Sequence, residues 1–197
     1  MATISLATII DESENICQGD VFQNVKYSYI DEDKDDSVEI VEYTFPMAIV
    51  VSQACDVISM GDMVCEQGGK ATKFMPSILM SPIYDIEKAK KTDHLKKAFE
   101  ELSIKKLDGK DDCLFYKDDI KVVEKDWHYR FHNLSVKVKN NVVLEKAIID
   151  FKHYFTVPAT YLIKKRKNRL FHLDDLYAEQ ITLKFSTYLS RVAIPEP

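Results

Sequence analysis

One stretch of this sequence limits the fold more than any other: after Pro46 comes an uninterrupted apolar run from Met47 to Val51. An unbroken apolar run predicts a central strand covered on both faces, because a strand with one face in water alternates apolar and polar residues. The longest apolar runs of the chain are of this strand length. They are too short to span a membrane, so we expect no membrane segment.

Further strands are predicted on both sides of this run. A Gly-Asp turn leads into alternating apolar residues from Val21 to Tyr29, and alternation returns from Val38 to Tyr43. The acidic residues 31–36 cannot be buried and predict a loop between these strands. Prolines flank a strand-like stretch at Ser77–Ser81. Later strands are predicted at Cys113–Tyr116, Ile120–Val123, Trp127–Leu134, Val136–Val138, Val142–Leu144, Ala147–Phe151 and Tyr154–Val157, with Asn140-Asn141 as a hairpin turn.

In two stretches of the sequence, the apolar residues recur at the spacing of an α-helix. Residues 85–106 carry apolar side chains at helical spacing among charged ones, with Asp85 as a plausible N-cap. A C-terminal helix is predicted over about 174–192, capped by Asp174 or Asp175 and ended by a proline. Its apolar face would hold Tyr177, Ile181, Phe185, Tyr188, Leu189 and Val192. Runs of strands with few helices favour an α+β fold over a parallel α/β sheet.

The composition is that of a folded intracellular domain. With 197 residues, 46% hydrophobic and 30% charged, the chain can bury a core, and we expect a single domain over residues 1–197. The first residues lack the basic segment with which a signal peptide begins. No two of the four cysteines have the CxxC spacing. We therefore expect reduced thiols and a cytoplasmic protein. A net charge of −5 argues against a general nucleic-acid coat.

Motifs for cofactors are missing from the sequence. There is neither a GxGxxG nor a Walker A sequence, so no nucleotide cofactor is expected. His128 and His132 have the spacing of zinc ligands on a helix, but the aromatic stretch around them predicts a strand. Residues four apart on a strand lie about 13 Å apart and cannot share one ion, so no metal is expected. No nucleophile elbow marks a catalytic triad.

Three segments, in order, resemble the MazF/PemK-like family of small SH3-like β-barrels. They are Gln18–Phe22 (QGDVF), Pro46–Ser52 (PMAIVVS) and Ile78–Ile83 (ILMSPI), within about residues 16–86. The resemblance implies an antiparallel barrel whose core comprises about residues 16–86 and 113–163. The helix at about 85–106 would be inserted in this barrel, and the C-terminal helix would be an addition to it.

The resemblance also implies a catalytic site. Family members that cleave single-stranded RNA use, without a metal, an arginine just before the Pro-Ala strand and a Ser or Thr after the later Pro-Ile. The arginine offsets charge on the transition state, and the hydroxyl positions the phosphate. Here Phe45 and Tyr84 stand at these positions. Phe45 supplies no charge, whereas Tyr84 keeps a hydroxyl, with Ser81 nearby. We therefore expect the ribonuclease chemistry to be absent, as in an accessory or regulatory relative.

A second candidate site is Ser52–Val57, directly after the central strand, where loops on a rigid scaffold often carry function. Cys55 beside Asp56 can act as a nucleophile or a ligand, although the carboxylate raises the thiol pKa. In the alternative interpretation, Cys55 packs as a small apolar residue and Asp56 caps a turn.

A third candidate site is a basic run between Tyr161 and Phe171. Its cations are Lys164, Lys165, Arg166, Lys167 and Arg169. Such a run can bind phosphates, and the two flanking rings can stack on bases. In the alternative interpretation, the run is a solvated hairpin tip that pairs with the acidic loop or with an acidic partner.

Two functions are consistent with these features. The first is a non-catalytic interaction or regulatory module that binds a protein partner in a bacterial toxin–antitoxin or anti-phage defence system, a setting that comes only from the resemblance. A homodimer through the barrel or the C-terminal helix is a further possible contact. The second is a divergent metal-independent endoribonuclease or single-stranded-RNA-binding protein, in which Arg130, Arg166 or Arg169 replaces the missing arginine.

Overall fold

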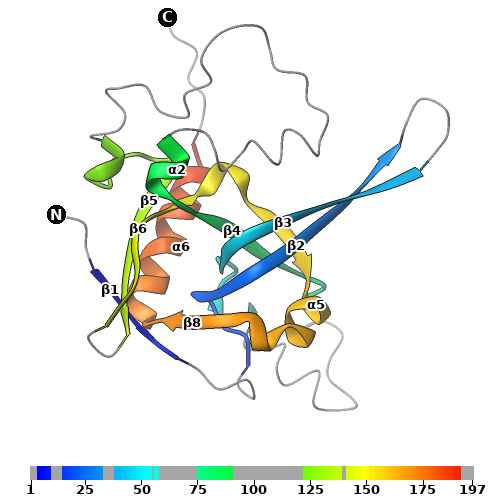
Figure 1. The fold of residues 1–197 in the computed structure, drawn as a ribbon, viewed down its shortest axis with the longest axis horizontal. Coiled ribbons are helices and arrows are strands. Elements are labelled where there is room, and N and C mark those ends of the chain that lie inside the picture. The colour runs from blue at the N-terminus through cyan, green and yellow to red at the C-terminus, as the bar shows by residue number, and fades with distance from the viewer. Residues whose placement is uncertain are drawn as a thin grey trace, which may run out of the picture.

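The structure is a computed structural model of the chain, and it describes residues 4–9, 15–32, 38–54, 56–57, 75–90, 122–138 and 141–191. Within these residues, eight strands form one sheet and the helices are few, which confirms an α+β fold (Figure 1). No helix in this part of the chain is long and apolar enough to cross a membrane.

The predicted central strand is part of β3 (Val38–Val50), which unites two runs that the pattern separated. β3 pairs antiparallel with β2 (Asp20–Glu32) on one side and with β4 (Ser77–Asp85) on the other. Ala48 and Val50 belong to one hydrophobic cluster, whereas Ile49 and Val51 belong to a second. Both faces of this strand are therefore covered, which explains why the run contains no polar residue.

The strands follow the order β3-β2-β8-β1-β5-β6-β4-β7. The pairing of β3 with β4 closes the strands from β3 to β4 into a ring, and β7 is attached to β4. The remaining strands are β1 (Ile4–Thr8), β5 (Phe131–Val138), β6 (Asn141–Asp150), β7 (Phe155–Pro158) and β8 (Arg169–Leu173). β1, which the sequence pattern did not predict, pairs parallel with β5. β1 lies outside the core predicted for the antiparallel barrel, so this parallel pair is an addition that the sequence pattern did not indicate.

The antiparallel pairing predicted for the strands that flank Asn140-Asn141 is confirmed, although Asn141 already begins β6 and residues 139–140 lie outside the described residues. β5 and β6 pair antiparallel, and Val138 lies opposite Asn141. The strands predicted at 142–144 and 147–151 are one continuous strand, β6. After a short 3-10 helix, η2 (Phe151–His153), β7 confirms the strand predicted next.

The prediction of a strand at Ile120–Val123 is wrong at Val122 and Val123, which begin a helical turn that ends at Glu124. Residues 120–121 lie outside the described residues. The strand predicted from Trp127 begins only at Phe131. Between these segments Asp126 has a φ of 60°, which interrupts the extended backbone and turns the chain. Aromatic residues that resembled the start of a strand therefore lie in a loop.

The start of the first predicted helix is confirmed as α2 (Ile86–Lys90). The Asp85 Oδ1 atom accepts hydrogen bonds from the backbone N–H groups of Glu87 and Lys88, both at 2.9 Å, so Asp85 is the N-cap. Residues 91–106 and the strand predicted at 113–116 lie outside the described residues.

The C-terminal helix is α6 (Asp175–Leu189), slightly shorter than predicted. Asp174 takes the N-cap position without a side-chain hydrogen bond. Ala178, Ile181 and Phe185 are buried and belong to the same hydrophobic cluster as Ile49. Figure 1 shows α6 lying alongside β5 and β6. Of the predicted apolar face, Ile181 and Phe185 are therefore buried in the core, whereas Tyr177 and Tyr188 are half-buried and Leu189 is 50% exposed. Val192 lies outside the described residues.

Candidate functional site

The position at which the family resemblance places a catalytic arginine lies in the core. Phe45 on β3 is 8% exposed, and its ring stacks on Phe155 with a centroid distance of 4.3 Å. Tyr43 meets the Phe45 ring edge to face at 4.5 Å. A phosphate has no access to this aromatic cluster, and a guanidinium placed there would be buried among apolar rings.

Ser81 and Tyr84 on β4, the weak catalytic candidates, are buried as well. Burial raises the pKa of the Tyr84 phenol well above its usual value, so this hydroxyl stays protonated. The Ser81 hydroxyl has no hydrogen-bond partner among the described residues. Because both side chains point into the fold, neither can meet an RNA strand at the surface.

The segment Ser52–Val57 continues from the end of β3. The Ser52 hydroxyl accepts a hydrogen bond from the Leu79 N–H at 2.8 Å, which ties the segment to β4. Asp56 is exposed and lies in a helical turn. Cys55 lies outside the described residues, so its role as a nucleophile or ligand stays a prediction.

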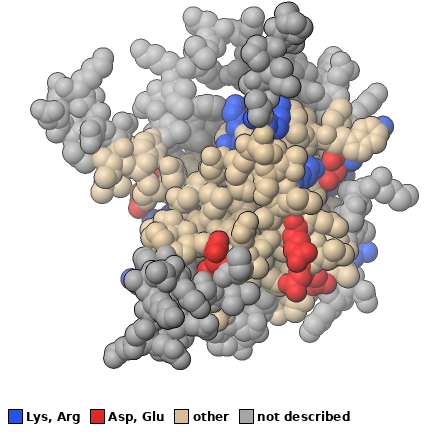
Figure 2. Space-filling model, turned by 180° about the vertical axis from the view of Figure 1, so that it is seen from behind, with Lys and Arg blue, Asp and Glu red and all other residues tan. Residues whose placement is uncertain are grey.

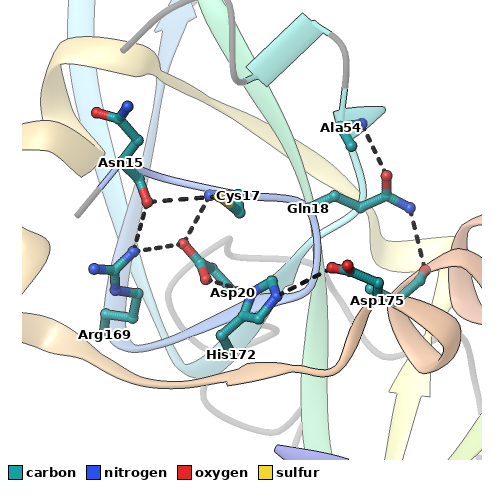
Figure 3. Close-up of polar contacts among 9 residues, drawn as sticks. Asn15, Cys17, Gln18, Asp20, Ala54, Arg169, His172 and Asp175 are labelled. Atoms are coloured by element: carbon teal, nitrogen blue, oxygen red, sulfur yellow. Dashed lines mark hydrogen bonds and ion pairs between the residues drawn. The ribbon is translucent and has the colours of Figure 1, made fainter. Parts of the chain in front are cut away.

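A buried polar cluster surrounds Asp20 at the start of β2 (Figure 3). The Asp20 Oδ2 atom accepts hydrogen bonds from the Cys17 N–H and from Arg169 Nη1, both at 2.9 Å. The other oxygen, Oδ1, lies 3.0 Å from His172 Nδ1. Only 2% of the Arg169 side chain is exposed. Arg169 is therefore part of an internal ion pair and cannot bind a phosphate at the surface, contrary to the prediction.

His172 on β8 lies between two carboxylates (Figure 3). Its Nε2 atom is 3.7 Å from Asp175 Oδ1 in the first turn of α6. The hydrogen bond with Asp20 raises the pKa of the imidazole, although burial opposes this effect. A larger fraction of His172 is thus charged near neutral pH than of a free histidine.

Gln18 and Gly19 attach the same turn to α6. Gln18 Nε2 donates hydrogen bonds to the Ala178 carbonyl at 3.2 Å and to the Thr182 hydroxyl at 2.6 Å. Its Oε1 atom accepts from the Ala54 N–H at 2.8 Å. Gly19 has a φ of +87°, and a Cβ there would lie 2.6 Å from Ala178 Cβ. The Gln-Gly-Asp turn therefore requires its glycine and serves to join β2, Ser52–Val57 and α6.

The basic run is not a hairpin tip. Lys164 ends helix α5 (Ala159–Lys164), and the run continues into the 3-10 helix η3 (Arg166–Asn168). Lys164, Lys165 and Lys167 are exposed, whereas Arg166 is half-buried. Among the described residues, none forms an ion pair with these three lysines. We call Lys164, Lys165 and Lys167 the lysine group.

The two rings beside the basic run have different environments. Phe171 is buried in the core, so the prediction that it stacks on a base is wrong. Tyr161 is half-buried, and its hydroxyl accepts a hydrogen bond from the Lys26 N–H of β2 at 2.9 Å. The predicted nucleic-acid site is thereby reduced to the lysine group beside Tyr161.

A surface that the sequence did not reveal lies before β5 and along α6. We call it the aromatic–arginine patch, made of Trp127, Tyr129, Arg130, Tyr154, Tyr188 and Arg191. Trp127, Tyr129 and Tyr154 are 73%, 49% and 44% exposed. The Arg191 guanidinium lies 3.3 Å from the centre of the Tyr129 ring. The Tyr129 and Tyr188 rings are almost parallel, with centroids 6.5 Å apart. Arg191, Tyr129 and Tyr188 are thus in one connected row, and the Trp127 ring, two residues before Tyr129, is contacted by Lys125 Nζ at 4.7 Å.

Beneath this patch, the buried carboxylate of Asp150 at the end of β6 binds two basic side chains. Arg130 donates through Nε and Nη2 to the two carboxylate oxygens, both at 2.7 Å, and His153 Nδ1 lies 2.8 Å from Oδ2. Burial alone would raise the pKa of Asp150, but the hydrogen bonds from His153 and Arg130 outweigh it and lower the pKa to about 2. Arg130 is therefore fixed in place and is not a free phosphate ligand, contrary to the prediction.

A second carboxylate, Asp126, orders the loop before β5. It accepts hydrogen bonds from Lys184 Nζ at 2.6 Å and from the Asn133 N–H at 2.8 Å, and it lies 3.0 Å from His132 Nδ1. Burial alone would raise the pKa of Asp126, but the hydrogen bonds from His132 and Lys184 lower it. The loop is thereby attached to both β5 and α6.

The expectation that His128 and His132 share one strand is wrong, because His128 precedes β5. The His128 ring stacks against Tyr129 with a centroid distance of 4.6 Å, while His132 pairs with Asp126. In the part of the chain that the structure describes, no group of three or more His, Cys, Asp or Glu side chains is arranged to bind a metal ion.

One sequence signal could have revealed the aromatic–arginine patch. Residues 127–132 alternate aromatic and basic side chains, which is unusual for a buried strand and typical of a binding surface. Tyr154 and Tyr188 come from distant segments, and only the fold shows that they join the patch. No family model matches this chain, and no curated protein or solved structure is significantly similar to it.

Proposed function

We propose that this chain is a non-catalytic binding module that recognises a protein partner through the aromatic–arginine patch. The exposure of Trp127, Tyr129 and Tyr154, with the exposed Arg191 over the Tyr129 ring, carries this proposal. Tryptophan, tyrosine and arginine are the residues that most often dominate the binding energy of protein interfaces. Their rings bury a large area on binding and lose little conformational entropy.

The order of the patch in the free chain supports this function. Asp150 fixes Arg130, and Asp126 attaches the loop before β5 to Lys184 of α6. Side chains that are already positioned reduce the entropic cost of association. Arg191 and Tyr188 extend the same surface beyond this loop. A partner would therefore meet a preformed surface and not a set of flexible side chains.

The burial of the family's cleavage positions supports a role without catalysis. Phe45, Ser81 and Tyr84 all lie in the core. We propose that the fold is an SH3-like barrel of the MazF/PemK type. The three segments that resemble this family lie on β2, β3 and β4, and these strands pair with one another in this order. The corresponding setting is a toxin–antitoxin or anti-phage defence system in the bacterial cytoplasm.

The distribution of charge on one face of the molecule favours a protein partner there over a nucleic acid. On the face shown in Figure 2, the acidic and basic side chains form small separate groups on a mostly uncharged surface. A strand of RNA needs a continuous basic track along its backbone. A protein interface, in contrast, combines an apolar centre with scattered charges at its rim.

Co-expression with the products of the adjacent genes tests the proposed partner. Each product would be expressed with the tagged chain, and we expect one of them to co-purify in stoichiometric amount. Replacing Trp127 and Tyr129 by alanine should abolish this complex, because the two most exposed rings of the patch are lost. The matched control replaces Leu176 and Leu183, which are also exposed but lie on α6 outside the patch. A complex that survives the first pair and is lost with the second would contradict the proposal.

The lysine group supports one alternative, single-stranded RNA binding with or without cleavage. The pure chain would be incubated with a long single-stranded RNA in EDTA, and we expect no discrete cleavage products. RNA affinity would then be measured against salt concentration. A steep loss of affinity with salt that disappears when Lys164, Lys165 and Lys167 are replaced by glutamine would establish this alternative, and cleavage would refute the non-catalytic role.

A further inference from the structure

Two carboxylates lie beside the aromatic–arginine patch, and each is bound by a cation of the same chain. Asp126 accepts a hydrogen bond from Lys184 Nζ at 2.6 Å, in the loop before β5. Asp150 accepts two hydrogen bonds from Arg130, both at 2.7 Å, and its side chain is completely buried. The negative charge of each carboxylate is therefore compensated within the chain and is not available to a partner.

Three cations on the same segments are exposed and lack such compensation. They are Lys125 in the loop before β5, Lys152 in η2 and Arg191 after α6. Among the residues that the structure describes, no carboxylate forms an ion pair with any of the three. Glu124, next to Lys125, is exposed as well, which still leaves an excess of positive charge. The patch is thus locally cationic on a chain whose net charge is −5.

Two of these cations lie on exposed rings of the patch. Lys125 Nζ is 4.7 Å from the centre of the Trp127 ring, and Arg191 Cζ is 3.3 Å from the centre of the Tyr129 ring. The His128 ring stacks on Tyr129 as well, with a centroid distance of 4.6 Å. A base of a nucleic acid needs a free ring face for stacking, and these contacts already occupy ring faces.

A cation that lies on a ring can still bind a carboxylate. The N–H donors of an ammonium or a guanidinium that point away from the ring remain able to donate hydrogen bonds, and the guanidinium matches a carboxylate with two of them. The geometry at Trp127 and Tyr129 therefore favours carboxylates over bases as the groups that meet the patch.

The surface between these cations is apolar. Trp127 is 73% exposed and Tyr154 is 44% exposed, so both rings leave a large apolar area in contact with water. Such an area is removed from water most favourably by other apolar side chains. A fitting partner therefore carries apolar side chains among its carboxylates.

We propose that the partner is a protein that presents an acidic segment, with apolar side chains among its aspartates and glutamates, to the aromatic–arginine patch. Its carboxylates meet Lys125, Lys152 and Arg191, and its apolar side chains cover Trp127 and Tyr154. Complementary charges of this kind accelerate association and discriminate between partners. This inference rests on the proposed function and adds to it the chemistry of the partner.

A synthetic peptide tests this chemistry before the partner is known. The probe is a short acetylated peptide that repeats Glu-Leu-Asp-Phe, and two matched peptides replace its acids by Gln and Asn or by Lys. Trp127 fluorescence reports binding. We expect the acidic peptide to bind, with an affinity that falls as salt is added. The neutral peptide should bind about tenfold more weakly, because the exposed ion pairs are lost. The lysine peptide should not bind.

Reversing the cations on the chain gives the second test. The pair Lys125→Glu and Arg191→Glu should weaken binding of the acidic peptide at least about tenfold and allow the lysine peptide to bind. The control pair, Lys164→Glu and Lys167→Glu, changes the net charge equally at exposed lysines outside the patch and should leave the affinity within about twofold. Circular dichroism would confirm that both variants are folded. An acidic peptide that binds no better than the neutral one, or that is affected equally by both pairs, would overturn the inference.

Two further results separate this inference from the proposed function. A purified complex that is lost with Trp127→Ala and Tyr129→Ala but withstands the reversal of Lys125 and Arg191 would leave the proposed function standing and overturn the acidic segment. Loss of the complex with either pair would support both. Single-stranded RNA that binds more tightly than the acidic peptide, and is released by the same reversal, would overturn both.

Discussion

Arg130 and Asp150 form a bidentate ion pair with two N–O distances of 2.7 Å, and the Asp150 side chain is completely buried. His153 contacts the same carboxylate at 2.8 Å. The pair connects the end of β6 to the loop that presents the aromatic–arginine patch. Because both partners are removed from water, the loss of one leaves the other without its counter-charge. Stability and patch geometry are therefore coupled at this point.

Replacing Asp150 by asparagine should lower the free energy of unfolding by about 3 kcal/mol at neutral pH. The folded-state pKa of about 2 lies below the unfolded value. The contribution of the pair is therefore complete above about pH 4 and is lost as the pH falls toward 2. Urea unfolding between pH 2 and pH 7 measures both effects. The exposed Glu145→Gln is the control, and an Asp150→Asn chain with the acid dependence of the wild type would contradict the assignment.

Replacing Gly19 by alanine should destabilise the chain by about 2–4 kcal/mol, because its φ of +87° is strained for alanine and the new Cβ would lie 2.6 Å from Ala178 Cβ. Ala178→Gly alone should cost about 1 kcal/mol, as glycine does within a helix. The double variant removes the clash and should be more stable than the sum of the single effects. Denaturant unfolding of all three variants measures this coupling, and strict additivity would exclude the contact.

The ion pair of His172 with Asp20 should make stability fall as the pH rises above the ordinary pKa of histidine. The folded-state pKa of His172 is raised by this hydrogen bond. The contribution is therefore complete below the unfolded value near 6.5 and is lost as the pH rises through the folded value. Melting temperatures across this range should decline more for the wild type than for His172→Gln. His128→Gln serves as the control, and identical pH profiles for all three chains would refute the pairing.

Features determined by neighbouring residues could be predicted from the sequence. The apolar run at Met47–Val51 indicated a strand covered on both faces, and the two clusters that receive Ala48 and Ile49 explain why. Asp85 was recognised as an N-cap because its partners lie only two and three residues away. The hairpin between β5 and β6 has an equally local signal in Asn140-Asn141.

Features determined by distant residues could not be predicted in this way. Arg169 looked like part of a surface run, but its partner is Asp20 at the other end of the chain. Phe171 looked like a stacking ring, although β8 lies between β2 and β1 and places it in the core. The parallel pairing of β1 with β5 likewise depends on the whole topology. Local composition shows charge and polarity, whereas burial depends on tertiary neighbours.

Because Trp127 is the single tryptophan, the fluorescence of the chain should report whether the patch is in contact with water. At 73% exposure, its fluorescence should have the emission of an indole in water and be quenched efficiently by acrylamide. Trp127→Phe should change the free energy of unfolding by less than about 0.5 kcal/mol, since a surface side chain contributes little to the core. Binding of the partner should shift the emission to the blue and reduce quenching. A buried emission in the free chain, or no change in a purified complex, would show that the patch is not the contact.

Restoring the arginine that the family resemblance implies should not restore ribonuclease activity. Phe45→Arg would place a charge between Tyr43 and Phe155, and we expect it to cost more than about 3 kcal/mol and to leave the chain largely unfolded. Phe45→Leu, which keeps an apolar side chain, should cost only about 1–2 kcal/mol and leave the fold intact. Urea unfolding and RNA incubation in EDTA would be applied to both variants. A stable Phe45→Arg chain that cleaves RNA would mean that this position opens to the surface, and that the chain is a silenced ribonuclease.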